Sequence, residues 1–386
     1  MNKEEIYFDY SATTRPYPEV IKTFDKVSFD DWGNPSSNHA LGYHASETLE
    51  KARKQIAKYL FVKPEEVIFT SGASEGNNLA IKGVCYHNKG WANRIITTKA
   101  EHPSVLNVFK KLEEEGFEVI YLDYDMNGNL DLEQLKNSLN SKTSLVSIMA
   151  INNEVGYIFD IEKAYKIVKE NSKATFHVDA TQAIGKINFP SDYYDLMTFS
   201  GHKIGGLKGS GILVHKKSVM LDEQIIGGSQ EGNLRAGTSM LGMDASIATA
   251  LRISITTLEE RTKNAIVINN YLREELSKID EVKIITPKEN STPFILNFAL
   301  MKHKGSVVSE ALSNNHIYVS TKSACSSKEA GYSYVIKSAG YSLIEASNSI
   351  RLSFHGYETI DQAKIFIETL KEILSDLKIK EIWYDK

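Results

Sequence analysis

The stretch that decides the fold is EVIFTSGASEGNNLAIKGVCYH, which runs from Glu66 to His87. It opens with a short β-branched and aromatic run, EVIFTS, of the kind that forms a buried strand. Small residues and a hydroxyl follow in GASEGNN, and apolar residues then recur at intervals of three and four, as in an amphipathic helix. The stretch therefore predicts a strand, a short connection and a helix in direct succession.

The same unit recurs through the first two-thirds of the chain. Further strand candidates are RIITTK, FEVIYLD, TSLVSIMA, ATFHVDA, YYDLMTFS and GILVHK, and helix-like segments such as SVLNVFKKLEEEG and IEKAYKIVKEN lie between some of them. This alternation indicates an α/β fold with a large, doubly wound and mainly parallel sheet. In such sheets ligands bind beyond the carboxyl ends of the strands.

The pattern changes near Ala245. A long helical region leads to PFILNFAL, a further helix candidate, IYVST, and a last helix near IDQAKIFIETLKEILSDL. Two strands with helices predict a smaller α+β domain, completed by the N-terminal segment. At 386 residues the chain is long enough for two cores. We therefore expect a large domain at 15–255 and a small domain formed by 1–14 and 256–386.

Composition excludes several classes of protein. The net charge of −4 gives no electrostatic reason to expect nucleic acid or an anionic membrane as a partner. No apolar run has the length of a signal-peptide core or a membrane span, so we expect a cytoplasmic protein. The two cysteines, Cys85 and Cys325, lack the spacing of a metal site or a disulfide framework. Each is expected to be a free thiol, either buried or nucleophilic.

Polar side chains follow five of the predicted strands. In chain order they lie in GASEGNN, at His102, at Asn153 and Glu154, at Asp179, and at Ser200, His202 and Lys203. Each has a structural alternative: a helix N-cap, a structural histidine, turn residues, a core salt bridge, or the basic turn of a β-hairpin in SGHKIGGLKGSG.

Taken together, these groups match the needs of one cofactor. A helix start built of small residues binds a phosphate, a buried carboxylate suits a pyridinium nitrogen, and a lysine amine forms a Schiff base with an aldehyde. No GxGxxG follows the first strand, and GGLKGSG lacks the order of a nucleotide-binding loop. The sequence therefore favours pyridoxal phosphate bound to Lys203, with glycines that let the chain bend around it.

A family resemblance rests on nine motifs that extend from about Tyr7 to about Ser353. They are YFDYSATT, GASEGNN, EHPSV, NNEVG, HVDATQAIGK, SGHKIGGLKGSGILV, GGSQEGNLRAGT, SACSS and SIRLS. In this order they resemble the motifs of the cysteine desulfurases, which belong to the class V aminotransferase group of fold-type I pyridoxal phosphate enzymes. The resemblance implies that the large domain binds the cofactor and that the small domain carries a catalytic cysteine loop.

The resemblance also implies a role for each matching residue. Lys203 looks like the lysine that binds the cofactor, Asp179 like the partner of its ring nitrogen, and Gln182 like a donor to its ring hydroxyl. His102 resembles the histidine stacked on the ring and is a candidate proton carrier. The other matches are a phosphate cradle (Ala73, Ser74, Ser200 and His202), a residue reaching the phosphate of the other subunit (Thr238), and contacts to cofactor and substrate carboxylate (Asn153 and Arg351).

Cys325 lies in the polar stretch STKSACSSKEAGYS and matches the catalytic cysteine of the family. The implied reaction converts L-cysteine to L-alanine and leaves the sulfur on Cys325 as a persulfide. The implied partners are a second copy of the chain and a sulfur-acceptor protein, either an iron–sulfur scaffold or a tRNA-thiolation enzyme. The alternatives are a selenocysteine lyase, a class V aminotransferase, or an inactive scaffold of the same fold.

The sequence departs from the commonest family pattern at several positions. Ser74 stands where threonine is frequent, Lys322 where glycine is common, and Asn233 and Leu234 where a more basic or glycine-containing segment is usual. His355 and Gly356 stand where glycine and arginine are frequent. The tail, which ends in LKIKEIWYDK, looks shorter than in members that serve iron–sulfur scaffolds, which weakly favours a dedicated acceptor such as a tRNA-thiolation enzyme.

Overall fold

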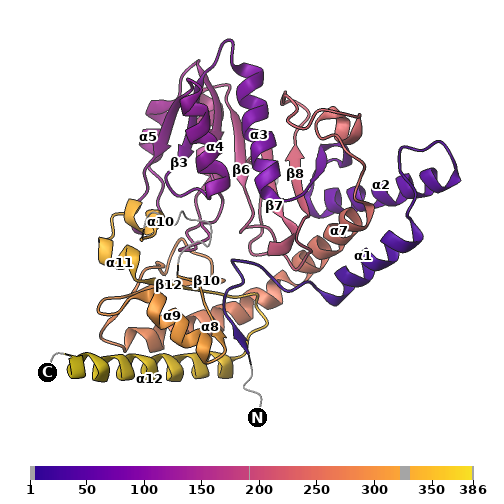
Figure 1. Ribbon diagram of the computed structural model, residues 1–386. Coiled ribbons are helices and arrows are strands. Elements are labelled where there is room, and N and C mark those ends of the chain that lie inside the picture. The colour runs from indigo at the N-terminus through magenta and orange to yellow at the C-terminus, as the bar shows by residue number, and fades with distance from the viewer. Residues whose placement is uncertain (1–4, 191, 322–330, 385–386) are drawn as a thin grey trace.

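A seven-stranded sheet forms the centre of the larger part of the molecule (Figure 1). The computed structural model describes residues 5–190, 192–321 and 331–384. The strand order is β2-β8-β7-β6-β5-β3-β4. The strands are β2 (Val67–Thr70), β3 (Arg94–Thr98), β4 (Glu118–Leu122), β5 (Thr143–Ser147), β6 (Thr175–Asp179), β7 (Leu196–Ser200) and β8 (Gly211–His215).

The sheet is mainly parallel, as predicted. Strands β4, β3, β5, β6 and β7 pair in parallel, whereas β8 pairs antiparallel with both β7 and β2. The glycine-rich segment between β7 and β8 is therefore a hairpin-type connection, with Ser200 opposite Gly211. The hairpin alternative is correct for the topology of this segment, and the connection nevertheless directs Lys203 into a cavity described below.

Helices cover both faces of this sheet (Figure 1). Successive strand residues point to opposite faces, and the buried clusters follow that rule: Val67 and Phe69 belong to one apolar core and Ile68 to the other. The second core contains residues of α3 and α4. The helices of this part are α1 (Pro18–Asp30), α2 (Ala40–Leu60), α3 (Ala73–Asn88), α4 (Pro103–Glu114), α5 (Leu132–Ser138), α6 (Ile161–Asn171) and α7 (Leu241–Thr256).

A smaller sheet lies below the large one in Figure 1, and residues of α8 (Leu258–Ser277) belong to its apolar core. Its strand order is β12-β10-β9, and β1 (Ile6–Tyr7) pairs in parallel with β11 (Ile317–Tyr318) nearby. The remaining elements are β9 (Val282–Ile284), β10 (Ile295–Leu300), α9 (Gly305–Asn314), α10 (Tyr334–Ser338), α11 (Leu343–Ser347), β12 (Ser349–Ser353) and α12 (Ile360–Tyr384).

The prediction of two strands in this region is incomplete. Strand β9 has only three residues, too few for a periodic signal, whereas SIRLS alternates polar and apolar residues and was detectable as a strand. The long helical region after Ala245 is likewise two helices, α7 and α8, separated at Thr257. Ile6 and Phe8 pack into the same apolar core as β10 and β12, so the N-terminal segment contributes to the small sheet's interior.

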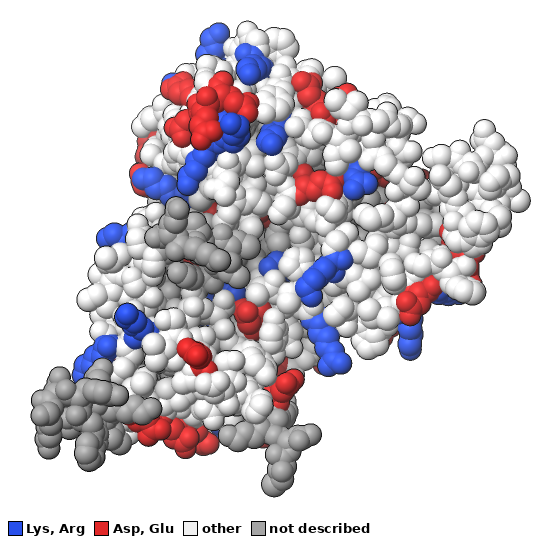
Figure 2. Space-filling model, viewed as in Figure 1, with Lys and Arg blue, Asp and Glu red and all other residues white. Residues whose placement is uncertain are grey.

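Charge on the surface is mixed. Figure 2 shows basic and acidic side chains interspersed on the face it presents, some of them adjacent to each other. Within residues 5–190, 192–321 and 331–384, no helix combines the length and the apolar character that a membrane span requires.

Candidate active site

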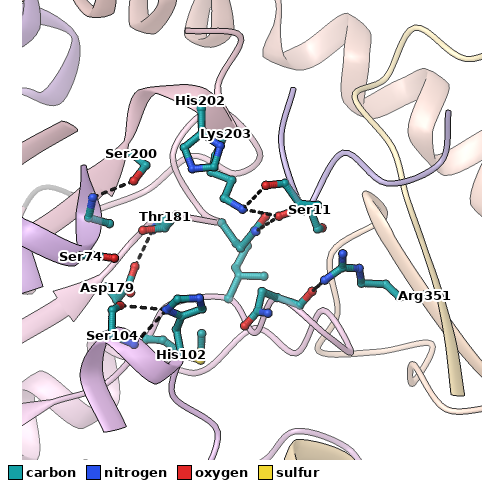
Figure 3. Close-up of a pocket in the computed structure, with 16 residues that line it drawn as sticks. Ser11, Ser74, His102, Ser104, Asp179, Thr181, Ser200, His202, Lys203 and Arg351 are labelled. Carbon is teal, nitrogen blue, oxygen red and sulfur yellow. Dashed lines mark hydrogen bonds between the residues drawn. The ribbon is translucent and has the colours of Figure 1, made fainter. Parts of the chain in front are cut away.

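A cavity of about 250 Å³ lies beyond the carboxyl ends of the large sheet's strands. Residues from the loops after β2, β3, β5, β6 and β7 line it, together with the N-terminal segment and β12. Its walls are Ser11, Ala12, Ala73, Ser74, His102, Ser104, Met149, Ile151, Asn153, Asp179, Thr181, Gln182, Ser200, His202, Lys203 and Arg351. Figure 3 shows Lys203, Asp179 and His102 turned toward a common space, with Arg351 approaching from the side.

One end of the cavity is the N-terminus of α3. The helix begins at Ala73, and its N-cap Gly72 has φ +153° and no side chain to cap the first N–H groups. The Ala73 N–H donates to Ser200 Oγ over 2.7 Å. Gly211 passes so close that a Cβ there would lie 2.5 Å from Gly72 Cα. The helix start therefore presents N–H groups and the positive end of a 16-residue dipole, which is an anion site.

Asp179, at the end of β6, supplies a buried negative charge. It is 4% exposed, and its carboxylate accepts hydrogen bonds from Asn77 Nδ2 at 3.0 Å and from the Thr181 N–H at 3.0 Å. Both donors are neutral, and no ion pair between described residues includes Asp179. A buried carboxylate without a cation favours a cationic group in the cavity.

His102 is the N-cap of α4, where its Nδ1 accepts the Ser104 N–H at 3.1 Å. Burial lowers the pKa of His102 below its usual value, and the charge of Lys203 adds to this effect while Asp179 opposes it. Because Nδ1 is an acceptor, the neutral ring carries its proton on Nε2. The neutral ring of His102 can therefore donate a hydrogen bond from Nε2.

Lys203 ends a single turn, Gly201–Lys203, that follows β7. Its Nζ donates to two backbone carbonyl oxygens of the N-terminal segment, Ser11 O at 2.5 Å and Ala12 O at 2.7 Å. The neighbouring His202 contacts Thr13 Oγ1, and burial together with the charge of Lys203 lowers its pKa to about 4. His202 is therefore neutral at physiological pH.

Arg351 closes the side of the cavity that faces the small sheet. Its side chain is 4% exposed, one terminal nitrogen pairs with Asp9 Oδ1 at 2.6 Å, and the other donates to Asn153 O at 2.8 Å. The Nε atom is buried without a hydrogen-bond partner in the described part of the chain. A guanidinium fixed in this way presents a planar fork to a carboxylate.

Comparison with known proteins assigns this chain to a family. The profile described as aminotransferase class-V matches residues 6–366. The chain belongs to the class-V aminotransferase family. A NifS/IcsS protein homologue from Lactobacillus delbrueckii subsp. bulgaricus is 39% identical over 372 residues, which cover 95% of this chain and 97% of the relative.

Two further class-V relatives extend the match. Cysteine desulfurase IscS from Dictyoglomus turgidum is 36% identical over 379 residues, covering 97% of this chain and 96% of the relative. A solved structure named NIFS-like protein has a TM-score of 0.91 and 37% identity, covering 96% of this chain and 100% of that one. The family resemblance predicted from the motifs, and with it the fold-type I architecture, is confirmed.

Enzymes of this class use pyridoxal phosphate, and the cavity fits that cofactor. The anion site at α3 suits its phosphate, the unpaired Asp179 carboxylate suits its ring nitrogen, and the Lys203 amine suits its aldehyde. Two buried hydroxyls of the cavity wall, Ser11 Oγ and Thr181 Oγ1, have no hydrogen-bond partner among the described residues. They are available to polar atoms of a ligand.

Ten residues predicted from the sequence line this one cavity. They are Ala73, Ser74, His102, Asn153, Asp179, Gln182, Ser200, His202, Lys203 and Arg351. Thr238 does not join them: it is exposed and lines a separate hollow with Trp32 and Asn34. Cys325 and Lys322 lie outside the described residues. The individual roles stay predictions.

The sequence interpretation gave no role to six residues of the wall: Ser11, Ala12, Ser104, Met149, Ile151 and Thr181. Ser11 and Ala12 act on Lys203 through backbone carbonyls, which no side-chain pattern reports. Ser104 was detectable, because a serine two residues after a helix-capping histidine is within reach of its ring; the Ser104 Oγ to His102 Nδ1 distance is 2.9 Å.

Proposed function

We propose that this chain is a cysteine desulfurase, which converts L-cysteine to L-alanine and transfers the sulfur to Cys325. One observation carries the proposal: Lys203, the unpaired carboxylate of Asp179 and the buried fork of Arg351 share one cavity. Full-length similarity to relatives named cysteine desulfurase supports it. The amine, the anion and the fork are the groups that a pyridoxal phosphate enzyme needs for an amino acid substrate.

The residues divide into those that hold the cofactor and those that hold the substrate. Lys203 binds the cofactor covalently, and Asp179 keeps its ring nitrogen protonated. Gln182 lies at the wall beside Ser11 and donates toward the ring hydroxyl. Pyridoxal phosphate supplies, when bound, an electron sink for negative charge that develops on the substrate. The phosphate is bound by the start of α3 with Ala73, Ser74, Ser200 and His202.

Arg351 orients the substrate through its carboxylate, with Asn153 beside it. The two contacts of the Arg351 guanidinium, to Asp9 and to the Asn153 carbonyl, fix the plane of the fork before substrate arrives. The Lys203 Nζ accepts the proton from the substrate Cα, and the Nε2–H of His102 serves as a proton donor. Burial keeps the pKa of His102 low, so the ring releases a proton readily once it has become protonated.

Sulfur transfer takes place between two thiols. The Cys325 thiolate attacks the substrate sulfur, an S–S bond forms, and the C–S bond breaks. The electron pair of the C–S bond stays with the substrate Cβ, which takes up a proton. L-cysteine and the Cys325 thiol thus yield L-alanine and a persulfide, with no external oxidant or reductant.

Cys85 provides a control for the assignment of Cys325 as the nucleophile. Cys85 is the only other cysteine and is completely buried in α3. Burial raises its pKa far above the usual thiol value, so Cys85 does not form the thiolate that sulfur transfer requires. Cys85→Ala should therefore retain activity, whereas Cys325→Ala should lose it.

The test measures alanine and sulfide formed from L-cysteine by the wild type, Cys325→Ala and Cys85→Ala, all loaded with pyridoxal phosphate and supplied with a thiol reductant that releases the persulfide sulfur as sulfide. We expect Cys325→Ala to retain the cofactor and to lose at least a thousandfold in rate, and Cys85→Ala to stay within threefold of the wild type. Full sulfide release by Cys325→Ala would refute the proposal. Transamination by that variant, or a strong preference for selenocysteine, would identify the alternative functions.

A homodimer is the second part of the proposal. Thr238 is exposed and does not line the cavity of its own chain, as expected for a residue that serves the phosphate site of another subunit. Large exposed apolar side chains also support a dimer interface here. Trp32, which lines the same hollow as Thr238, is 71% exposed, and Phe29 is 84% exposed.

Subunit complementation tests the dimer. Lys203→Ala lacks the amine in every site, and Thr238→Asp places a negative charge against the phosphate. If Thr238 acts across subunits, an equimolar mixture should recover about a quarter of the wild-type sites, because half the dimers are mixed and each has one intact site. Activity no higher than that of Thr238→Asp alone would refute this arrangement.

The sulfur acceptor and the compartment complete the proposal. We place the enzyme in the cytoplasm, where a reducing environment keeps Cys325 available as a thiol. The acceptor is a protein, either an iron–sulfur scaffold or a tRNA-thiolation enzyme. Trapping the Cys325 persulfide and following radioactive sulfur into purified candidates distinguishes these acceptors.

A further inference from the structure

Lys186 is a buried lysine behind the wall of the cavity. Its residue exposure is 4%, and it lies seven positions after Asp179, in the turn region that follows β6. Its Nζ donates a hydrogen bond to Gln182 Oε1. Among the described residues no carboxylate pairs with Lys186, so its burial is not offset by an ion pair.

The contacts with Lys186 and Ser11 fix the direction of the Gln182 amide. The Lys186 Nζ donates to the Gln182 oxygen, and the Ser11 carbonyl, which only accepts, requires the amide nitrogen on the opposite side. That nitrogen donates to Ser11 O at 3.0 Å, and the same carbonyl accepts the Lys203 amine. Gln182 and Lys203 are thus joined through a single oxygen atom. The second N–H of the Gln182 amide is available to an acceptor in the cavity.

The surroundings of Lys186 are cationic. Lys203, Arg261 and Arg351 all contribute positive charge, and burial together with these charges lowers the pKa of Lys186 well below its usual value. Arg261 is 1% exposed and donates to the backbone oxygens of Gly185, Ser254 and His355, not to a carboxylate. Burial of a methionine of similar shape at position 186 would cost less free energy than burial of this amine. A role in packing alone does not account for the lysine.

We propose that Lys186 is a positioning residue of the cofactor site, which holds the Gln182 amide with its N–H groups directed at Ser11 and at an oxygen of pyridoxal phosphate. The inference rests on the proposed function, since it assumes that cofactor. Lys186 itself does not line the cavity; it acts through Gln182. Loss of its hydrogen bond leaves a buried amide oxygen unpaired and frees the amide to rotate.

A double-mutant cycle tests the proposal by equilibrium binding of pyridoxal phosphate to the apoprotein, followed by absorbance of the lysine-bound form. We expect Lys186→Met to weaken binding about tenfold and Lys186→Arg, which keeps a donor, to weaken it less than threefold. In the Gln182→Ala background, Lys186→Met should change the affinity less than twofold. An equal loss in both backgrounds, or no loss in either, overturns the proposal.

A second variant covers the case in which Lys186→Met does not fold. Gln182→Glu gives Lys186 a carboxylate partner but removes the amide donor. The apoprotein should then unfold at a higher temperature while cofactor affinity falls at least tenfold. Unchanged affinity in Gln182→Glu overturns the proposal. If the wild type itself binds no pyridoxal phosphate, the proposed function fails as well, whereas normal wild-type binding with normal Lys186→Met binding rejects only the role of Lys186.

Discussion

Replacing Asp179 by asparagine separates the charge of this side chain from its shape. One carboxylate oxygen accepts the Thr181 N–H and the other accepts Asn77 Nδ2. Asparagine keeps the first contact through its oxygen. At the second contact, the NH₂ group of the new asparagine would face the NH₂ group of Asn77. The Asn77 amide can rotate by 180° to avoid this, because the Thr198 hydroxyl, which now donates to the Asn77 oxygen, is also able to accept from the Asn77 nitrogen. The change in the free energy of unfolding should therefore stay within about 1 kcal/mol.

The effect on the cofactor should be larger than the effect on folding. A charged hydrogen bond between the carboxylate and a protonated ring nitrogen is worth about 1.5–3 kcal/mol, which corresponds to roughly 10- to 150-fold. Asparagine is neutral and does not hold the ring in its protonated form. We expect Asp179→Asn to fold normally and to form alanine roughly 10- to 150-fold more slowly than the wild type.

The assay compares steady-state rates of Asp179→Asn loaded with pyridoxal phosphate and with its N-methyl analogue. The analogue carries a permanent positive charge on the ring nitrogen, so it no longer needs a carboxylate to stay cationic. It should therefore restore part of the lost rate in Asp179→Asn and none in a Lys203→Ala control. A wild-type rate for Asp179→Asn with the natural cofactor would refute the assignment of Asp179.

Three further predictions concern binding, acid stability and backbone packing. Arg351→Lys cannot present a planar fork, so the KM for L-cysteine should rise about 10- to 100-fold with kcat within a few-fold; an unchanged KM would exclude Arg351 as the carboxylate contact. Burial lowers the pKa of His177 from 6.5 to about 4. Between pH 6.5 and about 4 the imidazole therefore binds a proton in the unfolded chain but not in the folded chain. Within this range, His177 should lower the free energy of unfolding by about 1.4 kcal/mol for each unit by which the pH falls. Urea titrations at several pH values should show that the free energy of unfolding of His177→Asn depends less steeply on pH than that of the wild type. An identical dependence in the two proteins would count against this role of His177. Gly211→Ala would place a Cβ 2.5 Å from Gly72 Cα and should lower stability by about 1–3 kcal/mol, whereas Gly90→Ala, with open space around it, should be neutral in the same melting experiment.

Much of the site was predictable because its parts are local. A strand, a short loop and a helix are encoded by neighbouring residues, so Ser74, His102, Asp179 and Lys203 could each be placed at a strand end from the sequence. Parallel strands bring such ends to one edge. The cavity accordingly contains all four. The hydrophobic period also predicted that both faces of the large sheet are covered.

Contacts between distant segments were not predictable in the same way. Arg351 pairs with Asp9, 342 positions away, and this pair fixes the fork at the cavity. The reversed direction of β8 depends on hydrogen bonding to both β2 and β7. The link from Lys186 through Gln182 to Ser11 combines one local contact with one that spans 171 positions.

The sequence by itself determined the kind of chemistry, because residue types at the ends of strands limit which cofactor and substrate groups can be bound. It also determined the family, through motifs that are read along the chain. Only the tertiary structure decided which polar atoms already have partners and which are left for a ligand. The reason is physical: a hydrogen bond or an ion pair is satisfied by proximity in space, and the order of residues along a chain does not specify that proximity.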